Sequence, residues 1–368
     1  MKSKDSNIDF LLFLIVSALI LIGTVMVYSS SSAIADANQK FSNHAFFLKR
    51  QLIWLILAYV VMFVAAKIDI GKLRPMVGPS LVFSTFLLGV VFLTPEIRGT
   101  HRWLSLGFIT IQPSELFKYV LVFYLAHSLA LRGRTLEDTH LYRWPYGPVI
   151  VFSALLIAVE PDLGAVLVLG GTVIMLLFLA GARPTHLLYS LAGSALGVFI
   201  MVFVVGYKRG RVLDFWASLG DPMLAPHQVK QSILSLACGG AFGVGLGDGI
   251  FKQFFLPEPH TDFIFASIGE ELGLVGLTVT LMLLFGLIWR GMRIATRQTD
   301  RFRFLLATGL TLCLAVNICI NIAVVLGLIP TTGITLPFLS YGGSSLIMSA
   351  TAVGFLLNLS RGKAEYAT

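Results

Sequence analysis

Residues 10–28 have the sequence FLLFLIVSALILIGTVMVY, a run of 19 residues without a charge. A helix of about 20 apolar residues is long enough to cross the hydrocarbon core of a membrane. Lys2 and Lys4 precede this run, and Ala33-Ile34-Ala35 follows it like a signal-peptidase site. Because the apolar region of a signal peptide has only about 7–15 residues, we expect an uncleaved membrane helix here.

Nine further apolar runs follow along the chain. All ten cover residues 10–28, 52–66, 77–94, 116–131, 147–160, 163–181, 187–206, 264–289, 304–328 and 342–359. Of the 368 residues, 56% are hydrophobic and only 12% are charged, whereas soluble domains have about 25% charged residues. This composition excludes soluble multidomain enzymes and disordered chains, and the long runs favour helices over a β-barrel. The sequence predicts an all-α integral membrane protein, one polytopic domain (residues 1–368) of about ten transmembrane helices.

Lysine and arginine are distributed unevenly between the two ends of the predicted helices. With the N-terminus inside, 16 of the 27 Lys and Arg residues lie in inner segments, and 12 of the 19 acidic residues lie outside. Because inner loops of membrane proteins carry an excess of Lys and Arg, we expect both termini in the cytoplasm. This asymmetry accounts for the net charge of +8, so no nucleic-acid partner is predicted. The one long connection, about residues 207–263, is then extracytoplasmic.

Two groups of polar residues lie at the outer ends of helices in the first half of the chain. Glu115 and Lys118 are spaced i,i+3, so they can form a buried ion pair, line a polar cavity, or do both. In the cavity interpretation, Arg102 or Lys118 faces an anionic ligand. Asp162 follows Pro161, which cannot continue a helix, and can cap the next helix. A carboxylate that faces a ligand is the alternative for Asp162.

The other two groups lie in the long connection and in the last loop. Residues 256–265, LPEPHTDFIF, place Thr261 or Asp262 at a helix N-terminus, where a carboxylate is stabilised. Asp262 can therefore be a helix cap or a catalytic group. The glycines of residues 239–249 indicate a flexible or closely packed loop, not a nucleotide-binding loop. Residues 330–345, PTTGITLPFLSYGGSS, form an apolar loop that can re-enter a bundle where the protein satisfies its backbone.

The rest of the sequence contains no recognised catalytic motif. It has no zinc-protease motif, no serine nucleophile elbow and no nucleotide loop. Its three cysteines are too few and too scattered for a disulfide framework or a metal quartet. Asn317 and Asn321, spaced i,i+4 in an apolar run, are expected to hold neighbouring helices together.

Together, the four outer segments resemble the SEDS family (shape, elongation, division and sporulation). The matching strings are HRWLSLGFITIQPSELFK (101–118), PDLG (161–164), LPEPHTDFIFASIGEELGLVG (256–276) and LPFLSYGGSSL (336–346). They occur in the family's order and spacing, and the resemblance covers essentially the whole chain. The third and fourth strings are highly specific, and their residues resemble the family's cell-division members more than its elongation members.

The resemblance implies a peptidoglycan glycosyltransferase with ten helices in the bacterial cytoplasmic (inner) membrane. Members polymerise the lipid-linked disaccharide-pentapeptide, lipid II, at the outer face and release undecaprenyl diphosphate. They work with a class B penicillin-binding protein, a transpeptidase, among the division or elongation proteins, and they contact membrane lipids. The family's essential aspartate falls on Asp262, and its conserved glutamate and lysine fall on Glu115 and Lys118.

For this reaction we expect Asp262 to be the catalytic base, because a sugar hydroxyl is a poor nucleophile. The leaving diphosphate needs positive charge, which a divalent cation (Mg²⁺ or Mn²⁺) could supply. No cofactor is certain from the sequence. Four basic side chains are the alternative source of this charge: Arg102, Lys118, Arg209 and Arg211. The remaining candidates for substrate contact are Glu115, Asp162, His260 and Ser340.

Two other functions suit a polytopic bundle. A flippase for lipid II would need a polar path through the whole bilayer, with ionisable residues near the middle of the helices. Here the inner halves of the apolar runs contain almost no polar residues. A non-catalytic scaffold of a division complex would tolerate replacement of Asp262 and Lys118.

Overall fold

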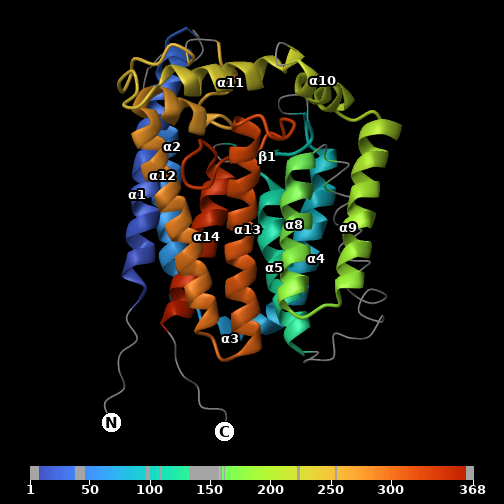
Figure 1. The fold of residues 1–368 in the computed structure, drawn as a ribbon. Coiled ribbons are helices and arrows are strands. Elements are labelled where there is room, and N and C mark those ends of the chain that lie inside the picture. The colour runs from blue at the N-terminus through green and yellow to red at the C-terminus, as the bar shows by residue number, and fades with distance from the viewer. Residues whose placement is uncertain are drawn as a thin grey trace.

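The computed structural model of the chain is a bundle of long helices with one short two-stranded sheet (Figure 1). It describes residues 8–37, 46–96, 100–105, 107, 110–131, 157, 160, 162–221, 224–252 and 255–361. The long helices are α1 (Phe10–Ala37), α2 (Phe46–Ala65), α4 (Val77–Val90), α5 (Pro113–Leu131), α8 (Leu163–Leu179), α9 (Pro184–Phe199), α12 (Ile264–Thr296), α13 (Arg301–Val325) and α14 (Gly343–Ser360). The short helical elements are α3 (Ile70–Leu73), η2 (Arg74–Met76), η3 (Val91–Leu93), η4 (Ile200–Val204), α10 (Arg209–Gly220) and α11 (His227–Cys238). Strands β1 (Leu104–Ser105) and β2 (Thr110–Ile111) pair antiparallel, with Leu104 opposite Ile111.

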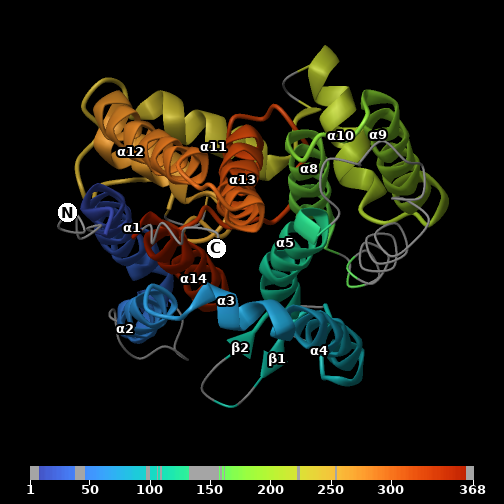
Figure 2. The same ribbon diagram turned by 90° about the horizontal axis from the view of Figure 1, so that it is seen from below.

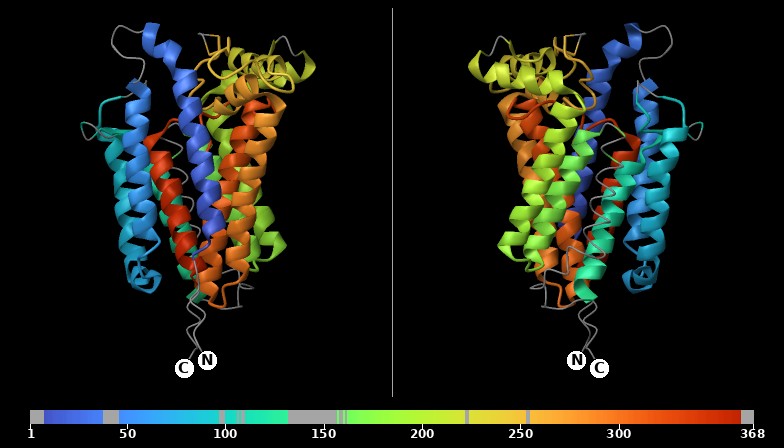
Figure 3. Two further views of the ribbon diagram at one scale, coloured as in Figure 1. Left: turned by 90° about the vertical axis from the view of Figure 1, so that its left-hand side faces the viewer. Right: turned by 90° about the vertical axis from the view of Figure 1, so that its right-hand side faces the viewer.

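The two ends of the bundle differ in what they carry. α1 begins and α14 ends at the same end, where Asp9 N donates to Ser360 Oγ at 3.0 Å. We call this the proximal end. At the opposite, distal end, α10 and α11 lie across the ends of the long helices (Figures 1 and 3). The connection predicted at 207–263 is therefore a structured cap over the distal end, in which residues 222–223 and 253–254 lie outside the described residues.

Nine of the ten predicted runs are helices in the structure. Within the described part of the chain, eight segments are long and apolar enough to cross a membrane, and α8 is apolar but has only 17 residues. The tenth run, 147–160, lies outside the described residues except for positions 157 and 160. The protein is a multi-pass membrane protein, and the predicted fold class of a polytopic α-helical bundle is confirmed.

Local chemistry explains several helix boundaries at the proximal end. Pro184 is the first residue of α9, where its missing N–H costs no helical hydrogen bond. Asp300 caps α13 by accepting from Arg303 N at 3.3 Å. The same carboxylate accepts from Arg74 Nη2 at 2.6 Å, which joins η2 to the start of α13.

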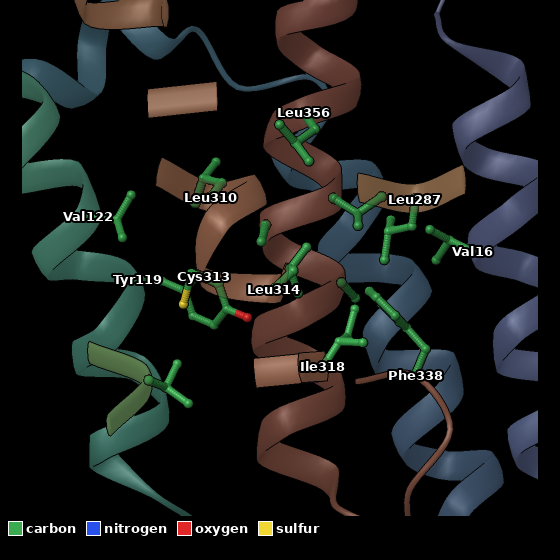
Figure 4. Close-up of a cluster of buried hydrophobic side chains, with 14 of the residues drawn as sticks. Val16, Tyr119, Val122, Leu287, Leu310, Cys313, Leu314, Ile318, Phe338 and Leu356 are labelled. Atoms are coloured by element: carbon green, nitrogen blue, oxygen red, sulfur yellow. The ribbon is translucent and has the colours of Figure 1, made fainter. Parts of the chain in front are cut away.

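α13 is the central helix of the bundle, in contact with α5, α8, α12 and α14. Leu310, Leu314 and Ile318 recur every four residues, so they line one face of α13. Figure 4 shows this face between Val122 of α5 and Leu287 of α12, and all five side chains are buried. The core is therefore continuous from α5 to α12 across α13.

Small residues let these helices approach closely. Lipid tails are as apolar as leucine, so helices in a membrane associate through tight packing rather than through exclusion of water. A Cβ added at Gly309 of α13 would lie 2.6 Å from Val122 Cγ1, and one at Gly354 of α14 would overlap Met62 O of α2. By contrast, Gly197 of α9 has no neighbouring atom within 4 Å of that position. α9 lies at the edge of the bundle (Figure 2).

We predict that Gly354→Val destabilises the bundle by about 1–3 kcal/mol or more, because the new side chain collides with main-chain atoms that cannot rotate away. Gly197→Val is the matched control, since the same change on α9 meets open space. The measurement is the thermal unfolding midpoint of each purified variant in detergent. Equal losses for the two variants would contradict the packing assigned to α2 and α14.

Candidate functional site

The loop between α13 and α14, residues 326–342, holds the segment that leads into α12. Tyr341 N donates to His260 O at 2.8 Å. The Ser340 hydroxyl donates to Thr261 O at 2.6 Å and accepts from the backbone of its own loop. The segment before α12 and the loop between α13 and α14, which are distant in sequence, therefore form one unit at the distal end.

Asp262 lies immediately before the N-cap of α12. The N-cap residue is Phe263, and no side chain caps this helix, so Asp262 does not serve as the cap. Asn321 Nδ2 donates to Asp262 O at 2.9 Å and to Ile334 O at 2.6 Å, which confirms that Asn321 joins neighbouring segments. A Cβ on Gly333 would lie 3.7 Å from Asp262 Oδ2, so the carboxylate borders the loop where that loop has no side chain.

His260 and Ser340, both predicted to contact substrate, are buried and engaged within the protein. The His260 ring lies 5.0 Å from the Phe47 ring and 5.7 Å from the Tyr341 ring, centroid to centroid. The single proton of the Ser340 hydroxyl is used at Thr261 O. Both residues therefore position the segment that carries Asp262, and their contact with substrate stays a prediction.

Basic side chains lie near this segment from two parts of the chain, the segment before β1 and the start of α10. Arg102 Nε donates to Glu160 O at 2.9 Å, and its Nη2 donates to Tyr207 Oη at 3.2 Å. Arg211 Nη1 donates to Thr331 O at 3.4 Å, on the loop between α13 and α14. The structure thus brings Arg102 and Arg211 together at the distal end. Arg209, the first residue of α10, is exposed.

Lys208 is a member of this group that the sequence analysis missed. Burial and the Arg102 and Arg211 guanidiniums lower the pKa of Lys208 to about 8, while Asp162 and Asp262 act in the opposite direction. Lys208 therefore lies among two cations and two carboxylates. It has left-handed backbone angles (φ 47°) just before α10, which turn its side chain away from that of the exposed neighbour. Nothing in the basic run of the sequence distinguishes Lys208 from the arginine that follows it.

Asp162 performs the capping role that was one of its two interpretations. Its Oδ1 accepts from Ala165 N at 3.0 Å at the start of α8. Its Oδ2 accepts from Gln112 Nε2 at 2.9 Å, which ties the β2–α5 junction to α8. Both oxygens are engaged within the protein, so Asp162 contributes its charge to the site through space.

Glu115 and Lys118 form the predicted buried pair, with Lys118 Nζ 2.8 Å from Glu115 Oε1. The other carboxylate oxygen, Oε2, is buried without a hydrogen-bond partner among the described residues. Lys118 also lines a small cavity between α5, α8 and α13, beside Thr172 and Cys313. The buried ion pair is therefore present, and Lys118 alone of the two residues borders this cavity, whose other walls are mostly apolar.

A second buried ion pair fixes the long connection to the bundle. Lys252 Nζ lies 2.8 Å from Glu271 Oε1, 2.7 Å from Gly247 O and 3.0 Å from Ser29 Oγ. Ser29 Oγ in turn donates to Glu271 Oε2 at 2.6 Å. The sequence analysis missed this network, although two adjacent glutamates in an otherwise apolar run are costly enough to suggest it.

The glycine-rich part of the connection packs directly on a break in α12. Gly273 has non-helical backbone angles (φ 64°) inside α12, which frees backbone groups for the loop. Leu274 N donates to Gly240 O at 2.9 Å. A Cβ on Gly243 would overlap Glu271 O, so no other residue fits there. Of the two interpretations of these glycines, the closely packed loop is correct.

The described residues contain no group of three or more His, Cys, Asp or Glu side chains arranged to hold a metal ion. Mg²⁺, however, is commonly bound by one or two carboxylates together with the phosphates of a substrate. Asp262 is a carboxylate of the site that is not used as a helix cap. The donor set therefore fits a cation that arrives with a phosphorylated ligand, and not one held by the protein alone.

Comparison with known proteins agrees with this architecture. The family model described as "Cell cycle protein", which covers FtsW, RodA and SpoVE, matches residues 9–365. The chain belongs to this family. The resemblance to the SEDS family found in the sequence is thereby confirmed over almost the entire chain.

The family members most informative here are bacterial. A probable peptidoglycan glycosyltransferase FtsW of Geobacter metallireducens is 41% identical over 359 residues, 96% of this chain and 94% of its own. The stage V sporulation protein E of Bacillus subtilis is 40% identical and covers 98% of this chain and 99% of its own. Among solved structures, RodA of Thermus thermophilus superposes with a TM-score of 0.72, 27% identity and 98% coverage of both chains. A chain from a peptidoglycan synthase complex gives a TM-score of 0.79 at 29% identity, covering 96% of this chain and 98% of its own.

We predict that Lys252→Met destabilises the protein by about 3–5 kcal/mol, because it leaves the buried Glu271 carboxylate without its cation. Adding Glu271→Gln should restore much of this loss, since no buried charge then remains. The measurements are thermal unfolding and limited proteolysis of the 239–260 connection in the two single variants and the double variant. Strictly additive effects would show that the two side chains do not interact.

Proposed function

We propose that this family member is a peptidoglycan glycosyltransferase that polymerises lipid II into glycan strands. The observation that carries the proposal is the position of Asp262, a carboxylate at the distal end, electrostatically coupled to Lys208 beside Arg102 and Arg211. A base next to a group of cations suits a reaction in which a hydroxyl loses a proton and a diphosphate leaves.

In this mechanism Asp262 accepts the proton of the 4-hydroxyl of the acceptor sugar. The hydroxyl oxygen forms a bond to the anomeric carbon of the donor, and the bond from that carbon to the diphosphate oxygen breaks. Undecaprenyl diphosphate leaves with the electron pair of the broken bond, and the anomeric configuration inverts. Asn321 of α13 and Ser340 of the α13–α14 loop keep the base in place.

Arg102, Lys208 and Arg211 stabilise the negative charge that develops on the leaving diphosphate. Arg102 and Arg211 reach the site from different segments and are held by main-chain and tyrosine oxygens, so these two need little reorganisation when charge develops. Asp262 would be the protein ligand of a divalent cation, Mg²⁺ or Mn²⁺, that arrives with the substrate, and the ion would supply further positive charge. The Glu115–Lys118 pair adds a further cation and carboxylate on the side of the bundle interior.

The location and partners of the protein follow from the same proposal. The distal end faces outward from the bacterial cytoplasmic membrane, and the proximal end, with both termini, faces the cytoplasm. A class B penicillin-binding protein of the division or elongation machinery cross-links the product. A solved relative from a peptidoglycan synthase complex supports a partner of this kind.

The distribution of buried charge favours polymerisation over lipid II transport. Among the described residues, most buried charged side chains lie at or near the distal end: Glu115, Lys118, Glu160, Asp162, Lys252, Glu270 and Glu271. Asp9, paired with Arg290, lies at the proximal end. Residues 304–325 of α13 include no Asp, Glu, Lys, Arg or His, and the face of α13 drawn in Figure 4 is apolar. A transporter would need ionisable groups along this path.

We predict that Asp262→Asn lowers lipid II polymerisation by about 10²–10⁴-fold, the usual contribution of a general base, and leaves the fold intact. The measurement is the glycan ladder formed from labelled lipid II, with Mg²⁺ or Mn²⁺ and with or without a cognate class B transpeptidase. Asp214→Asn, an exposed acid of the same connection, is the control. A folded Asp262→Asn protein with normal activity would refute the assignment of the base. Titrating the Asp262→Glu variant with metal separates a base from a metal ligand. Added metal should restore activity if the longer side chain only weakens metal binding, and should not restore it if the variant displaces the base.

We also predict an alkaline fall in kcat/KM with a midpoint near pH 8. Lys208 is charged below its pKa of about 8 and neutral above it, so the attraction for the diphosphate is lost as the pH rises. Losing a charge-assisted hydrogen bond costs about 1.5–3 kcal/mol, or roughly tenfold or more in kcat/KM. Lys208→Arg should abolish this fall, and Lys208→Gln should show the low alkaline value at every pH. A wild-type fall that persists in Lys208→Arg would rule out Lys208 as its cause.

A further inference from the structure

α10 begins where an apolar span ends. The span Pro184–Val204 ends in η4, and Gly206 (φ 80°) and Lys208 (φ 47°) then turn the chain. α10 starts at the next residue, Arg209, and lies across the distal end of α9 rather than continuing it (Figures 1 and 3). The helix is therefore placed at the level at which the span leaves the membrane.

One side of α10 exposes three large apolar side chains. Leu213, Trp216 and Leu219 are 44%, 63% and 72% exposed. They are spaced by three residues, so they form one stripe along the helix. The described residues leave this stripe uncovered, which is unfavourable in water and favourable in lipid.

The other two sides of α10 differ from this stripe. Arg211, Phe215 and Ser218 are partly buried and face the protein, as the hydrogen bond from Arg211 to the α13–α14 loop requires. Asp214 and Ala217 are exposed on the third side. At 100° per residue, these two positions lie between the protein-facing side and the apolar stripe. α10 thus has a protein side, a water side and an apolar side.

The composition of α10 matches a membrane surface better than a protein partner. Tryptophan is enriched at the boundary between lipid and water, where Trp216 would lie. With its two caps, the helix carries Lys208, Arg209 and Arg211 at its start and Asp214 and Asp221 further along. The exposed Arg209 lies at this basic start, and anionic lipid headgroups attract such segments. Both features occur in helices that lie in the plane of a membrane.

We propose that α10 is a membrane-surface anchor whose apolar stripe, Leu213, Trp216 and Leu219, inserts into the distal leaflet of an anionic bilayer. Helices of this type bury their apolar face about 5–10 Å into the boundary between headgroups and acyl chains. Lys208 and Arg211 belong to the first turn of this anchor, so the anchor sets their depth relative to lipid phosphates. This last consequence rests on the proposed function, whereas the insertion itself does not.

The test reads the depth of α10 directly and needs no substrate. Spin labels are attached at single cysteines in Leu213→Cys, Trp216→Cys, Leu219→Cys, Asp214→Cys and Ala217→Cys. The background carries Cys238→Ser and Cys319→Ser, which removes the two exposed thiols and leaves the buried Cys313 in place. The full chain is reconstituted in vesicles of phosphatidylethanolamine and phosphatidylglycerol. Collisions of each label with oxygen, which concentrates in lipid, are compared with collisions with a water-soluble nickel chelate.

We expect the labels at 213, 216 and 219 to collide more with oxygen, and those at 214 and 217 to collide more with nickel. Leu213→Ser combined with Leu219→Ser should shift the label at 216 toward nickel, whereas Asp214→Ser combined with Ala217→Ser should not. Equal nickel access at all five positions would place α10 in water and overturn the proposal. Low access of both reagents at 213, 216 and 219 would show that protein covers the stripe, which would also overturn it. An inactive Asp262→Asn enzyme with the same label pattern would separate this inference from the proposed reaction.

Discussion

The Lys252–Glu271 ion pair is the interaction on which the distal half of the structure depends. A buried ion pair offsets the cost of removing two charges from water only when its remaining hydrogen-bonding groups are also satisfied. Lys252 meets this condition, since its ammonium group donates to Glu271, Gly247 and Ser29. Glu271 accepts from Ser29 and from Gly247 N as well. Because the partners come from α1, α12 and the connection that precedes α12, one network sets the path of the chain toward Asp262.

Asp262 itself is held by neutral groups. Its main-chain oxygen and those of the two preceding residues accept hydrogen bonds from Asn321, Ser340 and Tyr341. These contacts involve main-chain oxygens, and the charge of the carboxylate acts on Lys208. α13 and the loop that follows it therefore support the site by fixing the orientation of the segment that carries Asp262.

The fold could be predicted from the apolar runs because a membrane-spanning helix is specified by length and composition, which residues 10–28 show plainly. The catalytic role predicted for Asp262 rested on the resemblance of residues 256–276 to the family's motif. The roles of its neighbours depended on three-dimensional contacts. His260 and Ser340 were predicted as substrate contacts, and the sequence did not show that an aromatic ring and a carbonyl group from distant segments orient them. Lys208 could not be separated from Arg209, because a left-handed turn decides which side chain faces inward. The apolar run around Glu271 suggests that its carboxylate needs a partner, but the sequence does not identify Lys252 as that partner.

The break at Gly273 also reconciles the length of α12 with the thickness of a membrane. α12 has 33 residues, so an unbroken helix would be about 50 Å long, well beyond a hydrocarbon core of about 30 Å. The part from Leu274 to Thr296 is about 35 Å long, close to that of its antiparallel neighbour α13, which has 25 residues. The residues from Ile264 to Leu272 then form a separate short helical segment beyond the membrane-length part. Glu270 and Glu271 belong to this short segment, so the two carboxylates lie outside the part whose length matches the hydrocarbon core, and Asp262 lies just before its N-cap residue, Phe263.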